Sequence, residues 1–115
     1  MKILKKFKQG VTCYQIYAGL GNMPWMETLH VTGPASENKY GGCLLLPYKH
    51  YNKYAGKLLD DQLALLDRSI GARDGWNGYN RHRLFFSKKK ALAYLELAKL
   101  FNEQWRGDKS KQQFS

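Results

Sequence analysis

Residues 87–105 read SKKKALAYLELAKLFNEQW and form the most regular pattern in the chain. Ser87 is a favoured helix N-cap, because its hydroxyl accepts a hydrogen bond from a free backbone N–H of the first turn. Small and apolar residues then recur with helical spacing: Ala91, Leu95, Ala98, Phe101 or Asn102, and Trp105. The pattern predicts one continuous helix over residues 88–105 with this face buried.

Upstream of this helix, the chain reads mostly as strands. Four segments rich in β-branched and aromatic residues are strand candidates: 11–18, 26–32, 40–46 and 82–86. The breaker pair Gly33-Pro34 ends the second segment, and Pro47 ends the third. Short connections between the first strands favour an antiparallel meander.

A shorter helix is predicted in the middle of the chain. Its apolar residues follow the i, i+4, i+7, i+11 spacing of one helical face: Leu59, Leu63, Leu66 and Ile70. Asp60 and Asp61 suit a helix N-terminus, and Gly71 suits a C-terminal cap. The expected fold class is therefore α+β: an antiparallel sheet of three to five strands, with the long C-terminal helix and this shorter middle helix packed on one face.

Composition indicates one folded domain. The chain has 115 residues, of which 43% are hydrophobic, enough for a single core. We expect this domain to cover residues 1–106 and residues 107–115 to form a polar, disordered tail. Cys13 and Cys43 lie in apolar segments and predict two reduced thiols, with a disulfide as the alternative. With no run of ~18 apolar residues and no secretory signal, we expect a cytoplasmic protein without a membrane partner.

The excess of basic over acidic residues is confined to the two ends of the chain. The formal net charge is +10, from 19 Lys+Arg and 9 Asp+Glu. Residues 10–80 hold six basic and six acidic residues, residues 1–9 contribute +4, and residues 81–115 contribute +6. An excess confined in this way favours a surface for a polyanion, or a partner protein that is itself acidic.

The strongest candidate site surrounds Ser87. Its basic members are Arg81, His82, Arg83, Lys88, Lys89 and Lys90. The free N–H groups and the dipole of a helix N-terminus attract anions, whereas three lysines in the first turn oppose that dipole. A bound phosphate would relieve their repulsion, so the segment is a candidate nucleic-acid contact. The alternative is a solvated basic face.

Residues 48–57, YKHYNKYAGK, interleave tyrosines with lysines. Single-stranded nucleic acid is bound by such patterns, because aromatic rings stack on bases while amines contact phosphates. The pattern predicts a second set of nucleic-acid contacts: Lys49, Tyr51, Lys53 and Lys57. The alternative is that Tyr51 and Tyr54 fill the core while the lysines extend to solvent.

Residues 71–80, GARDGWNGYN, form a glycine-rich loop. The loop lacks the Gly-Lys-Ser/Thr ending of a phosphate-binding loop. Trp76, Tyr79 and Arg73 are candidates for contact with a partner, since a few large side chains often supply most of an interface's energy. The alternative is that Trp76 folds back on the sheet.

The sequence shows no metal-site spacing and no nucleophile signature, so we expect no cofactor, no metal and no enzymatic activity. One enzymatic alternative is a metal-independent ribonuclease. In this alternative His82 transfers a proton, Arg81 and Arg83 on either side of it hold the phosphate, and His50 or Tyr79 is the second proton-transfer group. The arginines disfavour imidazolium, so His82 would act as the base.

Two parts of the chain resemble small accessory proteins of tailed bacteriophages. The first is ETLHVTG at residues 27–33, followed by NKYG at residues 38–41. The second is NRHRLFFS at residues 80–87, leading into the lysine-rich helix. The resemblance implies a host-takeover or anti-defence role, often directed at the host's nucleic-acid or defence machinery, and implies no family active site.

Charge, aromatic pattern and resemblance together predict a small basic binding protein. We expect it to act by occupancy on nucleic acid, RNA or DNA, or on a host nucleic-acid or defence enzyme, in the host cytoplasm if it is phage-encoded. One alternative is a protein-directed inhibitor of a host defence or transcription factor with an acidic patch. The other is the ribonuclease.

Overall fold

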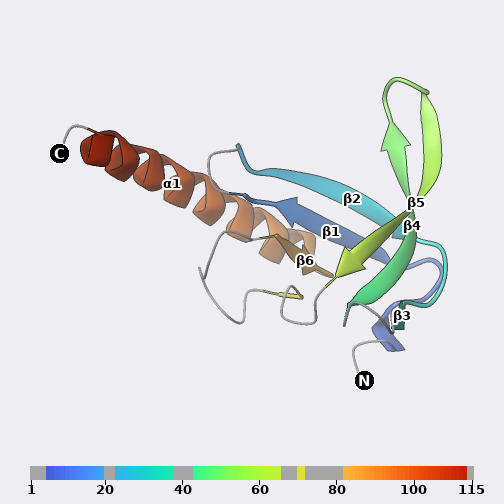
Figure 1. Ribbon diagram of the computed structural model, residues 1–115. Coiled ribbons are helices and arrows are strands. Elements are labelled where there is room, and N and C mark those ends of the chain that lie inside the picture. The colour runs from blue at the N-terminus through green and yellow to red at the C-terminus, as the bar shows by residue number, and fades with distance from the viewer. Residues whose placement is uncertain (1–4, 20–22, 38–42, 66–69, 72–81, 114–115) are drawn as a thin grey trace.

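The computed structural model describes residues 5–19, 23–37, 43–65, 70–71 and 82–113, with side chains as far as residue 100. Its elements, in chain order, are β1 (Thr12–Tyr17), β2 (Trp25–Val31), β3 (Ser36–Glu37), β4 (Leu44–Asn52), β5 (Lys57–Leu65), β6 (Arg83–Phe85) and α1 (Lys88–Gln113). The strands form one antiparallel sheet, and α1 packs across one face of it and extends beyond its edge (Figure 1).

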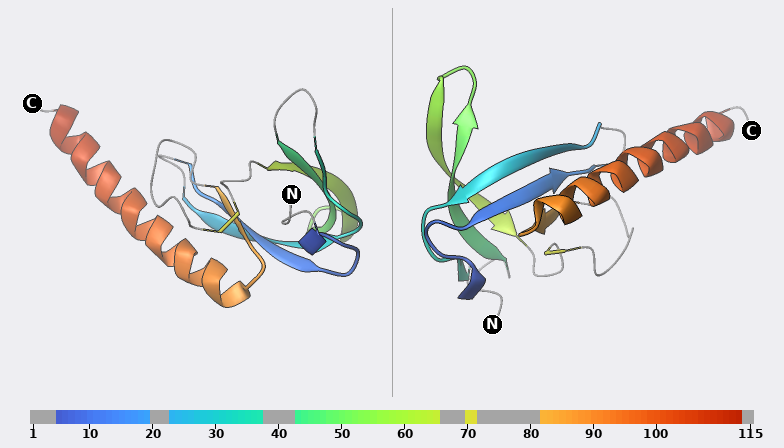
Figure 2. Two further views of the ribbon diagram at one scale, coloured as in Figure 1. Left: turned by 90° about the horizontal axis from the view of Figure 1, so that it is seen from below. Right: turned by 180° about the vertical axis from the view of Figure 1, so that it is seen from behind.

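The sheet curls into a half-barrel (Figure 2). β1 lies between β2 and β6, and β4 is flanked by β5 on one side and by β2 and β3 on the other. The predicted α+β architecture, a sheet with two helices on one face, is therefore wrong. In the part of the chain that the structure describes, six strands accompany a single helix.

The middle helix predicted over residues 59–70 is wrong at residues 59–65, which belong to β5, and its predicted member Leu66 lies outside the described residues. The strand β5 pairs with the whole of β4, from Leu44 opposite Leu65 to Asn52 opposite Lys57. The helical spacing of the leucines predicted the wrong element, because leucines in this segment also fit the period of a strand. Leu63 and Leu65, two residues apart, lie on one face of β5. In an antiparallel pair, every second residue forms hydrogen bonds to the partner strand through its N–H and its C=O. This pairing overrides the weak helical pattern of the side chains.

A tight turn fixes the register of β4 and β5. The side-chain Oδ1 of Asn52 accepts hydrogen bonds from the backbone N–H groups of Tyr54 and Ala55, each at 2.9 Å. Gly56 closes the turn with a left-handed φ of 67°, which favours glycine over residues that carry a Cβ. A short-range turn of this kind sets every later cross-strand pair.

Pro47 lies inside β4 instead of ending it. In an antiparallel strand, the N and C=O of one residue point to the same side, and at Pro47 this is the side away from β5. The Pro47 carbonyl accepts a hydrogen bond from the N–H of Thr32 at 3.1 Å. Thr32 lies in the connection from β2 to β3, on the side of β4 opposite β5. Proline therefore removes no hydrogen bond from the β4–β5 ladder.

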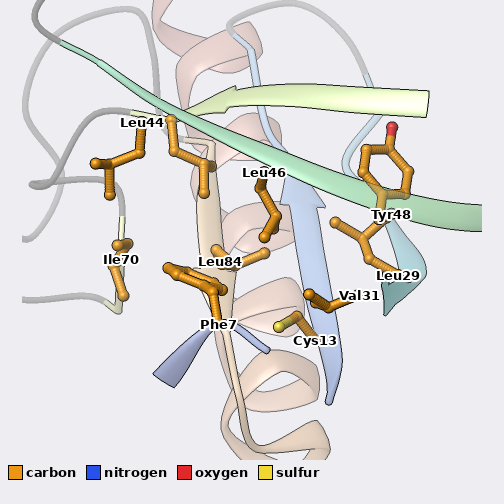
Figure 3. Packing of buried hydrophobic residues seen from close by; sticks show 10 residues of the cluster. Phe7, Cys13, Leu29, Val31, Leu44, Leu46, Tyr48, Ile70 and Leu84 are labelled. Carbon is orange, nitrogen blue, oxygen red and sulfur yellow. The ribbon is translucent and has the colours of Figure 1, made fainter. Parts of the chain in front are cut away.

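The two faces of the sheet carry separate cores. On the face covered by α1, the buried residues are Ile16, Ala18, Phe85, Ala91, Tyr94, Leu95 and Ala98. The opposite face, called the inner face below, packs a second cluster that Figure 3 shows: Phe7, Cys13, Leu29, Val31, Leu44, Leu46, Tyr48, Leu65, Ile70 and Leu84. Both faces of β1 are therefore buried, which makes β1 the centre of the fold.

Cys13 is part of the inner core. Its thiol is free, as is that of Cys43, so the two predicted reduced thiols are present in the structure. Burial raises the pKa of Cys13 to about 12. The thiol is thus protonated at neutral pH and packs as a small apolar group.

The predicted C-terminal helix is confirmed and is longer than expected. Ser87 caps it, since Ser87 Oγ accepts a hydrogen bond from Lys90 N–H at 3.3 Å. The predicted face is buried at Ala91, Leu95 and Ala98, and Tyr94 joins it. α1 continues to Gln113, so residues 107–113 of the expected tail are helical.

Replacing Leu95 by alanine tests the packing of α1 on the sheet. Leu95 is buried beside Ile16 and Phe85 in the core under the helix, whereas Leu97 on the same helix is exposed. We expect Leu95→Ala to lower the free energy of unfolding by about 2–5 kcal/mol, measured by urea denaturation. Leu97→Ala, the matched control, should change it by less than ~1 kcal/mol. Equal midpoints for the two variants would show that this face is not packed.

Candidate functional site

The two basic ends of the chain meet in space. Phe7 and Phe86 pack with ring centroids 5.2 Å apart, and Lys6 Nζ lies 5.7 Å from the Phe86 ring centroid. Because Phe86 immediately precedes the cap of α1, these contacts bring the N-terminal lysines to the first turn of the helix. We call the resulting group of exposed lysines the basic corner: Lys5, Lys6, Lys8, Lys88, Lys89 and Lys90.

The basic corner surrounds a helix N-terminus. The first turn of α1 contains no acidic residue, so its lysines are not neutralised within the turn. Their charges oppose the positive end of the helix dipole. Three of the predicted nucleic-acid contacts, Lys88, Lys89 and Lys90, are exposed in this turn, and the contact of Lys6 with Phe86 brings the N-terminal segment to the residue before its cap.

Two other predicted contacts lie inside the fold. Arg83 is only 4% exposed and its Nη1 donates a hydrogen bond to the His82 carbonyl at 2.8 Å. His82 Nδ1 accepts a hydrogen bond from Ala18 N–H at 2.9 Å. Burial, and secondarily the Arg83 charge, lowers the pKa of His82. The neutral imidazole expected from the sequence is thus present, but its Nδ1 holds the backbone instead of facing a substrate.

The β4–β5 hairpin carries the other predicted contacts. Figure 1 shows its turn projecting away from the rest of the sheet. Tyr51 is 65% exposed and Tyr54 90% exposed, so the alternative that these rings fill the core is wrong. Lys49, Lys53 and Lys57 are exposed beside them, with Lys53 Nζ 5.3 Å from the Tyr54 ring centroid.

The remaining predicted site residues are Arg73, Trp76, Tyr79 and Arg81. All four lie outside the described residues, so their roles remain predictions. Within the described part, no helix is both long and apolar enough to cross a lipid bilayer.

A polar cluster occupies one end of the inner face. Register places Gln15 opposite Glu27, Tyr17 opposite Trp25, and Tyr48 opposite Asp61. These residues continue the same face as the apolar core, because side chains alternate along each strand. Together with His50 they form what we call the polar cluster: Gln15, Tyr17, Trp25, Glu27, Tyr48, His50 and Asp61.

His50 lies between two carboxylates of the polar cluster. Its Nδ1 is 3.3 Å from Glu27 Oε1 and its Nε2 is 3.5 Å from Asp61 Oδ2. The first contact lacks hydrogen-bond geometry, since Glu27 Oε1 accepts no hydrogen bond from any described group. The carboxylates face different nitrogens of the ring and do not converge, and no group of His, Cys, Asp and Glu among the described residues can hold a metal ion.

Burial raises the pKa values of one carboxyl and two phenols of the polar cluster. It raises the pKa of Glu27, and the Asp61 charge raises it further while His50 opposes the change. Burial likewise raises the pKa of Tyr17 to about 12, with further contributions from Glu27 and Asp61. The pKa of Tyr48 rises for the same main reason, and a hydrogen bond to Asp61 adds to the rise. Both phenols are therefore neutral at pH 7.

The polar cluster also contains an aromatic platform. Trp25 stacks on Tyr17 with ring centroids 4.4 Å apart and an interplanar angle of 22°. Trp25 nevertheless remains 51% exposed. Its indole therefore has a large apolar surface on which a planar group can stack.

Sequence reasoning missed most of the polar cluster. Asp61 was assigned to a helix cap, and Gln15 and Tyr17 appeared only as parts of a strand. The available signal was the spacing of two residues between Gln15 and Tyr17 and between Trp25 and Glu27, which puts each pair on one face of a strand. Of the polar cluster's residues, the sequence gives a functional role to His50 alone, as a second group in the ribonuclease alternative.

Glu27→Gln tests the electrostatics of the polar cluster. A carboxyl whose pKa is raised by folding binds more protons in the folded than in the unfolded state. The free energy of unfolding therefore falls as the pH rises above 4.5, the ordinary pKa of a glutamate carboxyl. We expect the stability of the wild type to fall relative to that of Glu27→Gln between pH 4.5 and neutrality, measured by urea denaturation. Glu37→Gln, at an exposed position in β3, should follow the wild type. A wild-type stability that rises relative to Glu27→Gln would show that His50 dominates.

The comparisons with known proteins show the family of the chain. No curated protein and no solved structure matches the chain. The family model described as phage g100-like protein matches residues 1–98, which include all six strands and the part of α1 that packs on the sheet. The chain therefore belongs to the phage g100-like protein family.

Proposed function

We propose that this phage-family protein binds single-stranded nucleic acid through the basic corner and the β4–β5 hairpin. The observation that carries the proposal is the contact of Lys6 with Phe86, which joins two basic segments from opposite ends of the chain into one surface. Exposed lysines of one sign attract a polyanion to this part of the surface. Nucleic-acid phosphates form such a polyanion, and release of their counterions drives binding.

The hairpin supplies a contact for bases. Tyr51 and Tyr54 expose their rings beside three lysines, at a turn held rigid by Asn52 and Gly56. Exposed rings on a rigid turn lose little conformational entropy when a base stacks on them. Duplex nucleic acid hides its bases, so this contact favours single strands.

The protein acts by occupancy and not by turnover. The ribonuclease alternative needs a histidine free to exchange protons beside a phosphate-binding cation. His82 Nδ1 is already used by a backbone N–H, and His50 has carboxylates instead of cations beside it. A nucleic acid that this protein covers is inaccessible to host enzymes, and such an effect fits a protein of a phage family.

Reversing the charge of the first turn tests the basic corner. If about four phosphates are neutralised, the log of the binding constant should fall with the log of salt concentration with a slope of about −3 to −4. Replacing Lys88, Lys89 and Lys90 together by Glu should abolish binding of a mixed-sequence single strand. Fluorescence anisotropy over a salt series measures both effects.

Folding and position are controlled by two further measurements. Glutamates in a first helical turn interact favourably with the dipole, so the triple variant should melt no lower than the wild type. Lys99→Glu reverses a charge farther along α1 and should keep most of the binding. Wild-type protein that is not retained on heparin at low salt, or binding insensitive to the triple substitution, would contradict the proposal. A host protein that co-purifies after complete nuclease digestion would favour the inhibitor alternative instead.

Substitutions at the hairpin tip separate stacking from charge. Tyr51→Ala and Tyr54→Ala should each weaken single-strand binding by about 1–3 kcal/mol, because a stacked base is lost, and should leave the salt slope unchanged. Tyr51→Phe and Tyr54→Phe retain the rings and should bind like the wild type. Equal losses in the alanine and phenylalanine variants would show that the hydroxyls, and not the rings, make the contact.

A further inference from the structure

Two buried acceptor atoms of the polar cluster, Gln15 Oε1 and Glu27 Oε1, accept no hydrogen bond from a described group, although His50 Nδ1 lies 3.3 Å from Glu27 Oε1. Gln15 is 2% exposed. Gln15 and Glu27 are directly opposite each other in the β1–β2 ladder. Leaving two neighbouring acceptors unsatisfied is costly in a folded protein, so the site is suited to a ligand that brings N–H donors.

The polar cluster is open at its aromatic side. Trp25 is half-exposed, and the side chains of His50 and Asp61 are also partly exposed. Trp25 and Glu27 are two residues apart on β2 and therefore share a face of the sheet, next to each other along the strand. The geometry thus combines a stacking surface with acceptors at its edge.

Charge decides what kind of planar donor fits. A guanidinium group stacks on indole and donates to a carboxylate, but it belongs to a cationic partner that a chain of net charge +10 repels. A nucleobase brings neutral N–H donors and is attached to phosphates that the same charge attracts. The acceptor-rich cluster on a basic protein therefore favours a base of a polyanion over a basic peptide.

We propose that the polar cluster is a guanine-binding pocket for a base of the bound single strand, an inference that rests on the proposed function. Guanine presents N1–H and the N2 amino group side by side, a pair that matches one carboxylate. These groups donate to Glu27, with the amino group directed toward Gln15 Oε1, while the ring stacks on Trp25. Adenine and cytosine offer an amino group without the adjacent N–H, and thymine lacks the amino group.

Short thymidine oligonucleotides with one central substitution test the pocket. The full chain should bind the strand with a central guanine roughly 5- to 150-fold more tightly than the all-thymine strand, the usual value of a two-hydrogen-bond base contact. A central hypoxanthine, which lacks the N2 amino group but keeps N1–H, should retain only part of this preference. Isothermal titration calorimetry at one fixed salt concentration measures all three strands.

Two variants locate the preference in the polar cluster. Glu27→Gln replaces one oxygen of the carboxylate by an NH2 group, which donates instead of accepting. This variant should lose the guanine preference and keep the salt slope of the wild type. Glu37→Gln, the matched control on β3, should retain the preference. Trp25→Ala, at a half-exposed position, should also reduce the preference, which keeps the test valid if Glu27→Gln fails to fold.

The possible outcomes separate the two proposals. If the wild type binds all strands equally and with a steep salt dependence, the guanine pocket is wrong and the nucleic-acid proposal stands. If it binds no strand, both are wrong. A guanine preference that persists in Glu27→Gln or in Trp25→Ala overturns the assignment to this cluster. Glu27-dependent binding of an arginine peptide without any guanine preference overturns it in favour of a protein ligand.

Discussion

The position of β1 between β2 and β6 is the constraint on which the rest of the structure depends. Both neighbours pair with β1 in antiparallel register, so its side chains alternate between two buried faces. Ile16 packs under α1, and Cys13 packs in the inner core. The helix packs on one of these faces, and the buried residues of β4 and β5 join the core on the other.

The same alternation separates two kinds of electrostatic environment. Lysines gather outside the sheet, where water screens their mutual repulsion. The Glu27 carboxyl and the Tyr17 and Tyr48 phenols lie on the inner face, where burial raises their pKa values. A basic exterior around an acceptor-rich interior suits a ligand that has negative charge on its backbone and neutral donors on its side groups.

The helix was predictable from sequence because its signals are local. The Ser87 cap and the spacing of Ala91, Leu95 and Ala98 act within a few turns. β5 was not predictable in this way, because Leu59 and Leu63 suit a helix as well as a strand until β4 is placed beside them. Pro47 misled for a similar reason: its effect depends on which neighbour its missing N–H faces.

The candidate site divides along the same line. Lysines of the first turn and of the hairpin were found from composition and spacing, since surface charge is visible in the sequence. Gln15 and Glu27 were not found, because their meaning comes from being opposite each other across two strands. The meeting of the two basic ends also needed three dimensions, since it depends on the packing of Phe7 against Phe86.

The buried thiol in the inner core has a chemical consequence. Thiolates, not thiols, react with alkylating reagents and oxidants, and a pKa of about 12 leaves Cys13 almost entirely un-ionised at neutral pH. Its reaction therefore requires the half-barrel to open. Cys13 is a native reporter of such opening: the rate at which it is alkylated measures how often the strands of the inner core separate.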